Sequence, residues 1–251
     1  MEGLSAELAW RPVVIRLHNV ASTQDWVRDW ARMGAREGLI LIAREQNAGR
    51  GRLYRSWESR PGGLYLSALM RPLRLPLARA SQLTMLVSLA AIDACQAVAG
   101  VTPQPKWPND LLLERKKLAG VLTEIENDGP WLRYAVIGLG LNVNNDFGRG
   151  PLTETAASLR SVTGRSFDVA AVADAFIAAL GRRYAALRAG ASPHHAWARE
   201  LEPLGRRVTV QRGGQKPLAG RAENVSPEGA LLVRDDAGAL HTIWAGDVVI
   251  E

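Results

Sequence analysis

The sequence predicts an α+β fold, in which helices pack on one face of a mixed, mostly antiparallel sheet, followed by a small C-terminal β-barrel. In the first two hundred residues strands are joined both by helices and by short turns, which favours α+β over a doubly wound parallel sheet. After Gly205, short alternating strands are separated by the turn signals RGGQ, SPEG and DDAG, as in a five-stranded barrel. We therefore predict two domains, residues 1–203 and residues 204–251.

The elements of the first domain follow from hydrophobic periodicity. Residues 22–35 predict a helix that Ser22 or Thr23 caps, with Trp26, Trp30 and Met33 at the i, i+4, i+7 spacing of an apolar face. Strands are expected at residues 11–20, 39–45, 64–71, 105–113, 117–126 and 131–144, and further helices at 77–99, 168–190 and 192–200. Residues 46–63 show no regular period, and connecting segments of this length are usually functional or disordered.

Composition excludes several classes of protein. The chain of 251 residues is 47% hydrophobic and 22% charged, which is ordinary for a globular protein with a sizeable core. The longest apolar run contains Asp93 and Gln96, and the first ten residues lack a cationic start, so we expect neither a membrane span nor a signal peptide. A single cysteine, Cys95, excludes an internal disulfide and fits a reducing cytoplasm; its apolar helical surroundings indicate a core position.

The charge pattern leaves the class of partner open. A net charge of +6 and a pI near 10.0 permit anionic partners, but the arginines are spread along the chain without a basic block. No histidine has metal-ligand spacing to a cysteine or another histidine, so no protein-bound metal is expected.

The aperiodic segment contains the motif AGRGR, residues 48–52. Glycines permit close backbone approach to a ligand, and Arg50 and Arg52 supply forked donors suited to a carboxylate or phosphate. Trp57 adds a flat face on which a base could stack. The motif alone fits a solvated flexible loop equally well, and it is not a Walker A loop.

A second motif, KWPNDLLLERKKLAGVL, brings Lys116 and Lys117 to the start of an apolar strand. Strict alternation directs Lys117 to the same face as Ala119 and Val121. Beside Ala119 and Gly120, a lysine could reach the floor of a pocket. Taken alone, the spacing fits two ordinary turn lysines as well.

Two further stretches carry weaker signals. Gly138 and Gly140, in VIGLGLNVN, indicate a close approach to that strand, by either a ligand or a packed helix. The third glycine and the helix of a dinucleotide fingerprint are missing. Ser22 and Thr23 cap a helix, or present hydroxyls and backbone N–H groups to a polar ligand.

The order of these motifs is more specific than any one of them. ST, Q-x-x-GRGR, W, GGLYLS, KWPND, K-x-A-G and GLGLNVN, followed by a small barrel, closely resemble the biotin–protein ligases, the biotin–[acetyl-CoA-carboxylase] ligase family. The resemblance runs from about residue 13 to the C-terminus. Since it begins almost at Met1, the chain is similar to the class that lacks an N-terminal DNA-binding domain.

The resemblance implies a class II synthetase-like catalytic domain, an SH3-like C-terminal barrel and a two-step reaction. Biotin and MgATP would give biotinyl-5′-AMP and pyrophosphate. The biotinyl group would then pass to a lysine of a biotin carboxyl carrier domain, of acetyl-CoA carboxylase or a related carboxylase. A cytoplasmic enzyme is implied, with no DNA or membrane partner. Whether it is a monomer or a homodimer stays open, because an edge strand beside VIGLGLNVN could pair across a two-fold axis.

The resemblance also implies site residues. Lys117 and Arg52 would be catalytic, with Lys117 touching the biotin carboxylate and the α-phosphate, and Lys116 would be its solvated neighbour. The biotin-binding positions implied are Ser22, Thr23, Gln24, Gln46, Arg50, Gly51, Arg52, Lys117, Gly138 and Gly140. The ATP and adenylate positions implied are Arg52, Trp57, Asn109, Asp110 and Asn142, with Mg²⁺ accompanying ATP.

The sequence departs from the family pattern at several places. Gln24 stands where the family often has Asn, and Leu53 and Tyr54 stand where it often has a cation and a glycine. Since the chain ends with GDVVIE, any family contact from a basic residue near the C-terminus is expected to be missing.

Two alternatives remain at this level. A lipoate– or octanoyl–protein ligase of the same fold would recognise a ligand without a ureido ring. A nucleic-acid-binding module would show a continuous basic face with interleaved aromatics, but residues 205–251 mix both charges and contain one aromatic, Trp244.

Overall fold

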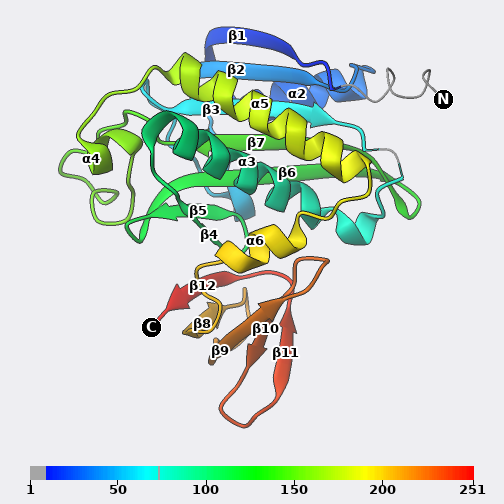
Figure 1. The fold of residues 1–251 in the computed structure, drawn as a ribbon, viewed down its shortest axis with the longest axis vertical. Helices are drawn as coiled ribbons and strands as arrows, with labels where there is room; N and C mark the ends of the chain where they lie inside the picture. Colours follow the sequence, from blue (N-terminus) through cyan, green and yellow to red (C-terminus); the bar gives the residue numbers. More distant parts are fainter. Residues whose placement is uncertain (1–9, 73) are drawn as a thin grey trace.

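A computed structural model describes residues 10–72 and 74–251, and its larger part is a seven-stranded mixed sheet (Figure 1). The expectation about a signal peptide concerns residues 1–10, of which residues 1–9 lie outside this range. The strands of this sheet are β1 (Val13–Val20), β2 (Leu39–Gln46), β3 (Leu64–Met70), β4 (Gln104–Lys106), β5 (Asp110–Leu113), β6 (Lys116–Asp128) and β7 (Trp131–Leu141). Their order is β1-β2-β3-β7-β6-β5-β4. Among the described residues only β1 and β2 pair in parallel, which confirms the α+β class.

Two long helices cover one face of this sheet. Helices α3 (Ser81–Ala99) and α5 (Val169–Arg188) lie side by side in front of it in Figure 1. Alternate side chains of β2, β3 and β7, such as Ile40, Leu66 and Ile137, join them in the main core. The guanidinium of Arg183 donates to both carboxylate oxygens of Asp93 at 2.6 and 2.7 Å, which fixes α5 against α3.

Helix α2 (Thr23–Arg32) departs from the predicted one-face arrangement, because it packs on the opposite face. Its N-cap is Ser22, as predicted, and its inward residues include Val27 and Ala31, which pack against Leu41 of β2. Of the three residues that the spacing marked as the apolar face, Trp26 is 43% exposed and Met33 is 74% exposed, whereas Trp30 packs against this core. Short α2 therefore covers only part of this face of the sheet, and the rest is open for a site.

The segment predicted as one strand at residues 105–113 is a hairpin. Strands β4 and β5 pair antiparallel around a turn at Trp107 and Pro108, so the single-strand prediction was wrong. The WP dipeptide turns the chain because proline fixes its own φ and restricts the preceding residue. Buried Trp107 donates from Nε1 to the Gly229 carbonyl at 2.9 Å, which ties the hairpin to the C-terminal strands.

The C-terminal strands form a separate five-stranded antiparallel sheet, below the large sheet in Figure 1. They are β8 (Arg207–Gln211), β9 (Leu218–Val225), β10 (Leu231–Arg234), β11 (Leu240–Ile243) and β12 (Asp247–Ile250), in the order β11-β10-β9-β8-β12. The five strands match the predicted number. Two short helices, α4 (Leu159–Thr163) and α6 (His194–Glu200), complete the fold, and only α6 was predicted.

The apolar character of α3 is explained by its burial. By length and composition alone, Leu77–Ala99 could cross a membrane, but 72% of its most apolar window is buried inside the protein. It packs against the large sheet and against α5, as a core helix does. Cys95 is buried in this helix, which confirms its predicted core position.

Burial makes Cys95 an inert thiol. It raises the pKa of Cys95 to about 12, so the nucleophilic thiolate is scarce at neutral and mildly alkaline pH. We expect iodoacetamide at pH 8 to leave the native protein unmodified and to add one carbamidomethyl group after denaturation, measured by intact mass. Labelling of native protein at the rate of a free thiol would contradict this burial.

Candidate active site

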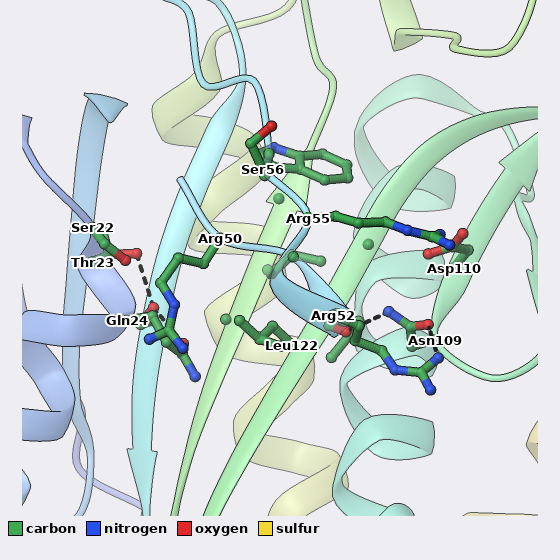
Figure 2. A pocket seen from close by; sticks show the side chains of 18 of the residues that line it. Ser22, Thr23, Gln24, Arg50, Arg52, Arg55, Ser56, Asn109, Asp110 and Leu122 are labelled. Carbon is green, nitrogen blue, oxygen red and sulfur yellow. Dashed lines mark hydrogen bonds between the residues drawn. The ribbon is translucent and has the colours of Figure 1, made fainter. Parts of the chain in front are cut away.

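The predicted site residues meet on the face of the large sheet that α3 and α5 leave uncovered. A cavity of about 130 Å³ lies between the N-terminus of α2, residues 46–57, β6 and β7 (Figure 2). Every residue predicted for the site lines this cavity except Asn142. The cavity is also lined by residues that the sequence did not indicate: Leu53, Arg55, Ser56, Leu66, Ser67, Gly120, Val121, Leu122, Leu139 and Asp247.

The floor of the cavity is polar and rich in hydrogen-bond acceptors. Gln46 Oε1 accepts from the backbone N–H of Thr23 at 2.8 Å and from its hydroxyl at 3.0 Å. Thr23 Oγ1 lies 2.9 Å from Ser67 Oγ, which donates to Gln24 Oε1 at 3.0 Å. The hydroxyls of Thr23 and Ser67 have two protons between them, but they take part in three side-chain contacts. The oxygens of the floor can therefore accept further hydrogen bonds from donors of a ligand.

Two of these floor residues need comment. Ser67 was missed from the sequence, although it is the one polar residue of the fully buried strand LYLSALM, which was the available signal. Gln24 is 3% exposed, and its amide nitrogen donates to the Val136 carbonyl at 2.9 Å. Its longer side chain therefore lies folded down on β7, and its oxygen faces the floor network.

Glycines in the central strands make room over the sheet. A Cβ on Gly138 would lie 2.7 Å from Gln24 Oε1, and one on Gly140 would lie 2.4 Å from the indole of Trp57. Gly140 pairs across the strands with Gly120, whose own Cβ would come within 3.0 Å of the same indole. The close approach predicted at the two glycines of β7 is thus a side-chain approach on the cavity face.

Lys117 reaches the cavity because of a β-bulge. The pairing of β5 with β6 shifts so that Leu111 faces Ala119 whereas Leu112 faces Lys117. This bulge reverses the alternation, so Lys117 turns to the cavity face and not, as predicted, to the face of Ala119. Its ammonium lies 2.8 Å from Asp110 Oδ1 and 5.3 Å from the centre of a Trp57 ring.

Lys116 was expected to be solvated, but it has a partner in the protein. Its ammonium donates to the Thr153 carbonyl at 3.0 Å, so it is bonded to the chain between β7 and α4 and is not simply solvated. The chain between β7 and α4 also contacts Lys117, whose backbone N–H donates to the Thr155 carbonyl at 2.8 Å. The start of β6 is therefore held from both sides.

The segment at residues 46–63 is folded over the cavity. Its backbone forms isolated bridges between Gln46 and Ser59 and between Arg50 and Ser56. Figure 2 shows Arg52 pointing to Asn109, to whose Oδ1 it donates at 2.9 Å. Burial lowers the pKa of Arg52, which stays a cation. Arg55 pairs with Asp247, so the segment also contacts the C-terminal strands.

The tip of this segment carries two large exposed side chains in a strained backbone. Leu53 has φ of 54° and is 63% exposed; Tyr54 has φ of 60° and is fully exposed. The left-handed region costs a non-glycine residue about 1–2 kcal/mol. Tyr54 pays this cost where the family pattern often has glycine.

A second cavity of about 680 Å³ adjoins the first, and Trp57, Asp110 and Lys117 line both. Its charged lining consists of Lys106, Arg115 and Lys117 with Glu58, Asp110 and Glu154. Asn142 belongs here and not to the first cavity. Its amide donates to the Ala157 carbonyl at 3.0 Å and to the Lys117 carbonyl at 3.4 Å.

Comparisons with known proteins agree on one kind of relative. The sequence model described as the biotin/lipoate A/B protein ligase family matches residues 18–142, and the biotin protein ligase C-terminal domain matches residues 204–250. The bifunctional ligase/repressor BirA of Bacillus spizizenii is 37% identical over 168 residues, which are 66% of this chain and 51% of that relative. The biotin–[acetyl-CoA-carboxylase] ligase of Mycobacterium tuberculosis is 30% identical over 253 residues, covering 98% of this chain and 91% of that protein. A structure of biotin protein ligase from Aquifex aeolicus in complex with biotin and ATP has a TM-score of 0.80 and 27% identity, covering 95% of this chain and 98% of that one.

Proposed function

Because the chain belongs to the biotin/lipoate A/B protein ligase family, we propose that it is an ATP-dependent biotin–protein ligase. It joins biotin and ATP into biotinyl-5′-AMP with release of pyrophosphate, then transfers the biotinyl group to a lysine of a carrier protein. The observation that carries the proposal is the meeting of two cavities at Lys117, Asp110 and Trp57. One cavity has an acceptor-rich floor, and the other has a lining of mixed charge.

The first cavity suits biotin better than lipoate. The ureido ring of biotin carries two N–H donors, and the floor of Thr23, Gln24, Gln46 and Ser67 has acceptor capacity in surplus over its own donors. Lipoate has no ureido group, so it could not use the remaining acceptor capacity of these oxygens and would lose hydrogen bonds worth about 0.5–1.5 kcal/mol each. Gly138 and Gly140 let the Gln24 side chain and the Trp57 indole lie close against the sheet, where both line this cavity.

Lys117 suits the adenylation step. When the biotin carboxylate attacks the α-phosphate of ATP, two anions approach one another. An ammonium fixed at that point offsets their repulsion and stabilises the charge that develops in the transition state. Asp110 and the Trp57 ring hold the Lys117 ammonium at the boundary of the two cavities, where this attack would occur.

The second cavity suits a nucleotide. Lys106 and Arg115 line it as counter-charges for phosphates, and Trp57 presents its ring at the boundary. Asn109 and Asp110 line the first cavity, and Asn142 donates to the backbone carbonyl of Lys117. We therefore assign Asn142 a positioning role and not a direct contact with the nucleotide.

Magnesium fits this lining as a companion of ATP. Mg²⁺ keeps several waters and is bound by one or two carboxylates plus substrate phosphates. Asp110 and Glu154 line the nucleotide cavity, and residues 10–72 and 74–251 contain no cluster of three His, Cys, Asp or Glu side chains that could hold a metal by itself. Bound with ATP, the ion would neutralise part of the phosphate charge.

The partner we propose is a biotin carboxyl carrier domain of acetyl-CoA carboxylase or a related carboxylase, met in the cytoplasm. We assign residues 1–203 to the catalytic domain and 204–251 to the C-terminal barrel.

A DNA partner is disfavoured because arginines of the barrel are paired with acids: Arg207 with Asp236, and Arg234 with Glu223. A homodimer could form by strand pairing at the edge of β6 beyond Gly120, which pairs with no other strand among residues 10–72 and 74–251.

Pyrophosphate release tests the function directly. Purified protein with MgATP should release pyrophosphate when biotin is added and should label a carrier domain with biotin. Release with lipoate and not with biotin would assign the protein to the sister activity. Release with neither would refute adenylation of both acids, and salt-dependent binding to generic DNA would then favour the nucleic-acid class.

A methyl group at Gly140 should obstruct the biotin cavity. Its Cβ would lie 2.4–2.8 Å from three atoms of the Trp57 indole, so the ring must move. We expect Gly140→Ala to raise the KM for biotin by about tenfold or more, since a misplaced wall costs roughly 1–3 kcal/mol. Initial rates at varied biotin measure this. Gly213→Ala is the control, since a Cβ there meets nothing within 4 Å; an unchanged KM in Gly140→Ala would contradict the assignment of this cavity.

A further inference from the structure

Arg50, which lines the first cavity, forms a closed network of alternating charge with three side chains that do not line it, Asp25, Arg28 and Glu124. Arg50 lies 2.5 Å from Asp25 Oδ1 through Nη1 and 2.7 Å from Glu124 Oε1 through Nη2. Arg28 contacts the same two acids at 2.7 and 3.4 Å. Two cations and two anions thus balance one another.

The network joins three segments that are far apart in the sequence. Asp25 lies in the first turn of α2, Glu124 lies in the middle of β6, and Arg50 belongs to the segment folded over the cavity. Figure 2 shows the Arg50 side chain extending from that segment toward Gln24, at the start of α2. One guanidinium therefore links the cover of the cavity to two of its walls.

These ion pairs are shielded enough to contribute. The side chain of Glu124 is 26% exposed and those of Asp25 and Arg50 are 35% and 37% exposed. Burial by itself lowers the pKa of Arg50, but the carboxylates of Glu124 and Asp25 outweigh it and raise the pKa. Partly buried pairs in a network hold more strongly than isolated surface pairs, yet added salt still weakens them.

The same charge balance makes Arg50 a poor ligand for a phosphate. The Arg50 guanidinium stays a cation, but the two carboxylates to which it donates offset its charge and occupy its donors, so it has little to offer at the reacting atoms. Arg52 differs, because its contact is the neutral amide of Asn109. The two arginines of the GRGR motif are therefore not equivalent.

We propose that Arg50, Asp25 and Glu124 form a strap that holds residues 47–57 closed over the biotin cavity, so that the two acids are positioning residues for retention of the acyl-adenylate. The proposal rests on the proposed ligase function. Opening of the strap would admit water and release the mixed anhydride before the carrier lysine arrives. The strap acts on how long the intermediate stays, and adenylation itself depends on Lys117.

The first test follows the segment itself, without substrates. Trypsin cleavage after Arg52 and Arg55 is measured by mass spectrometry for the wild type, Arg50→Ala and the double variant Asp25→Asn/Glu124→Gln. The matched control is Asp29→Asn/Glu126→Gln, which removes the same charges from α2 and β6 at exposed positions. We expect cleavage to be about tenfold faster in both strap variants, because they lose ion pairs that raise the free energy of local opening of the segment. Cleavage of the control should be unchanged.

Two features separate a strap from a general loss of stability. Added salt should accelerate cleavage of the wild type and leave Arg50→Ala unaffected, because its pairs are already gone. Combining Arg50→Ala with the two acid substitutions should give no further acceleration, since all three changes remove one interaction. Equal cleavage in the strap variants and the control would overturn the proposal.

The second test follows the intermediate. Protein loaded with biotin and MgATP is passed through a desalting column, and bound biotinyl-AMP is measured over time. The Asp25→Asn/Glu124→Gln variant, whose two residues do not line the cavity, should lose it about tenfold faster, with single-turnover pyrophosphate release within about twofold of the wild type. Adenylate retained as in the wild type would refute the strap while leaving the ligase function intact. Wild type that forms no adenylate, with cleavage as predicted, would refute the function and leave the strap standing.

Discussion

Replacement of Lys117 by alanine should nearly abolish biotin-dependent pyrophosphate release. Loss of a single preorganised group that stabilises transition-state charge costs about 10²–10³-fold in rate, and Lys117 is the cation that lines both cavities beside Asp110. The fold should survive, because the side chain is partly exposed and its removal leaves the backbone bonds of β6 in place. Single-turnover pyrophosphate release at saturating biotin and ATP measures the effect.

The neighbouring lysine provides the control. Lys116→Ala removes the same charge one residue away, but that ammonium donates to the Thr153 carbonyl and lines neither cavity. We expect its rate to stay within about threefold of the wild type. Equal losses in the two variants would mean that charge at the start of β6, and not the position of Lys117, supports the reaction.

The contrast between these lysines shows where sequence reasoning fails. Alternation along a regular strand sends Lys117 into the same face as Ala119 and Val121. The bulge between β5 and β6 reverses this, and a bulge depends on how two strands pair, which one strand's own sequence does not state. Lys117 was assigned to the site through the order of the motifs, and its direction became clear only with the pairing.

Other errors have the same origin in tertiary structure. The spacing of Trp26, Trp30 and Met33 is regular, but of these three residues only Trp30 packs against the core beside β2, β3 and β7. Helix periodicity marks an apolar stripe without saying whether the sheet contacts it. Ser67 is a single serine in an apolar strand, and its role emerges only beside Thr23 and Gln24, more than forty residues earlier in the chain.

The elements themselves were easier to predict. Both long helices and the strands flanking them were expected close to their observed bounds, because their apolar patterns are long and bounded by turn residues. The hairpin at residues 104–113 was not, since its strands are short and the turn at Trp107 and Pro108 interrupts one apolar run. Short elements contain too few side chains to show a period.

Replacement of Arg52 by glycine should leave the fold intact and let the acyl-adenylate escape. Arg52 donates to Asn109 from the segment that covers the cavity, so its loss frees that segment from the β4–β5 hairpin. Glycine also widens the conformational freedom of the open segment by roughly 0.5–1 kcal/mol. We expect biotinyl-AMP to dissociate at least about tenfold faster, measured by the time course of bound adenylate after desalting.

A released acyl-adenylate reacts with any nearby amine, so the same variant should biotinylate bystander proteins added to the reaction. Arg60→Gly is the matched control, because Arg60 is exposed, pairs with Glu58 and lines neither the biotin nor the nucleotide cavity. That variant should label only the carrier domain. If Arg52→Gly retains adenylate as long as the wild type does, Arg52 does not close the cavity. If instead its adenylation rate falls while retention is unchanged, the guanidinium acts on the reacting phosphates and the Asn109 contact is incidental.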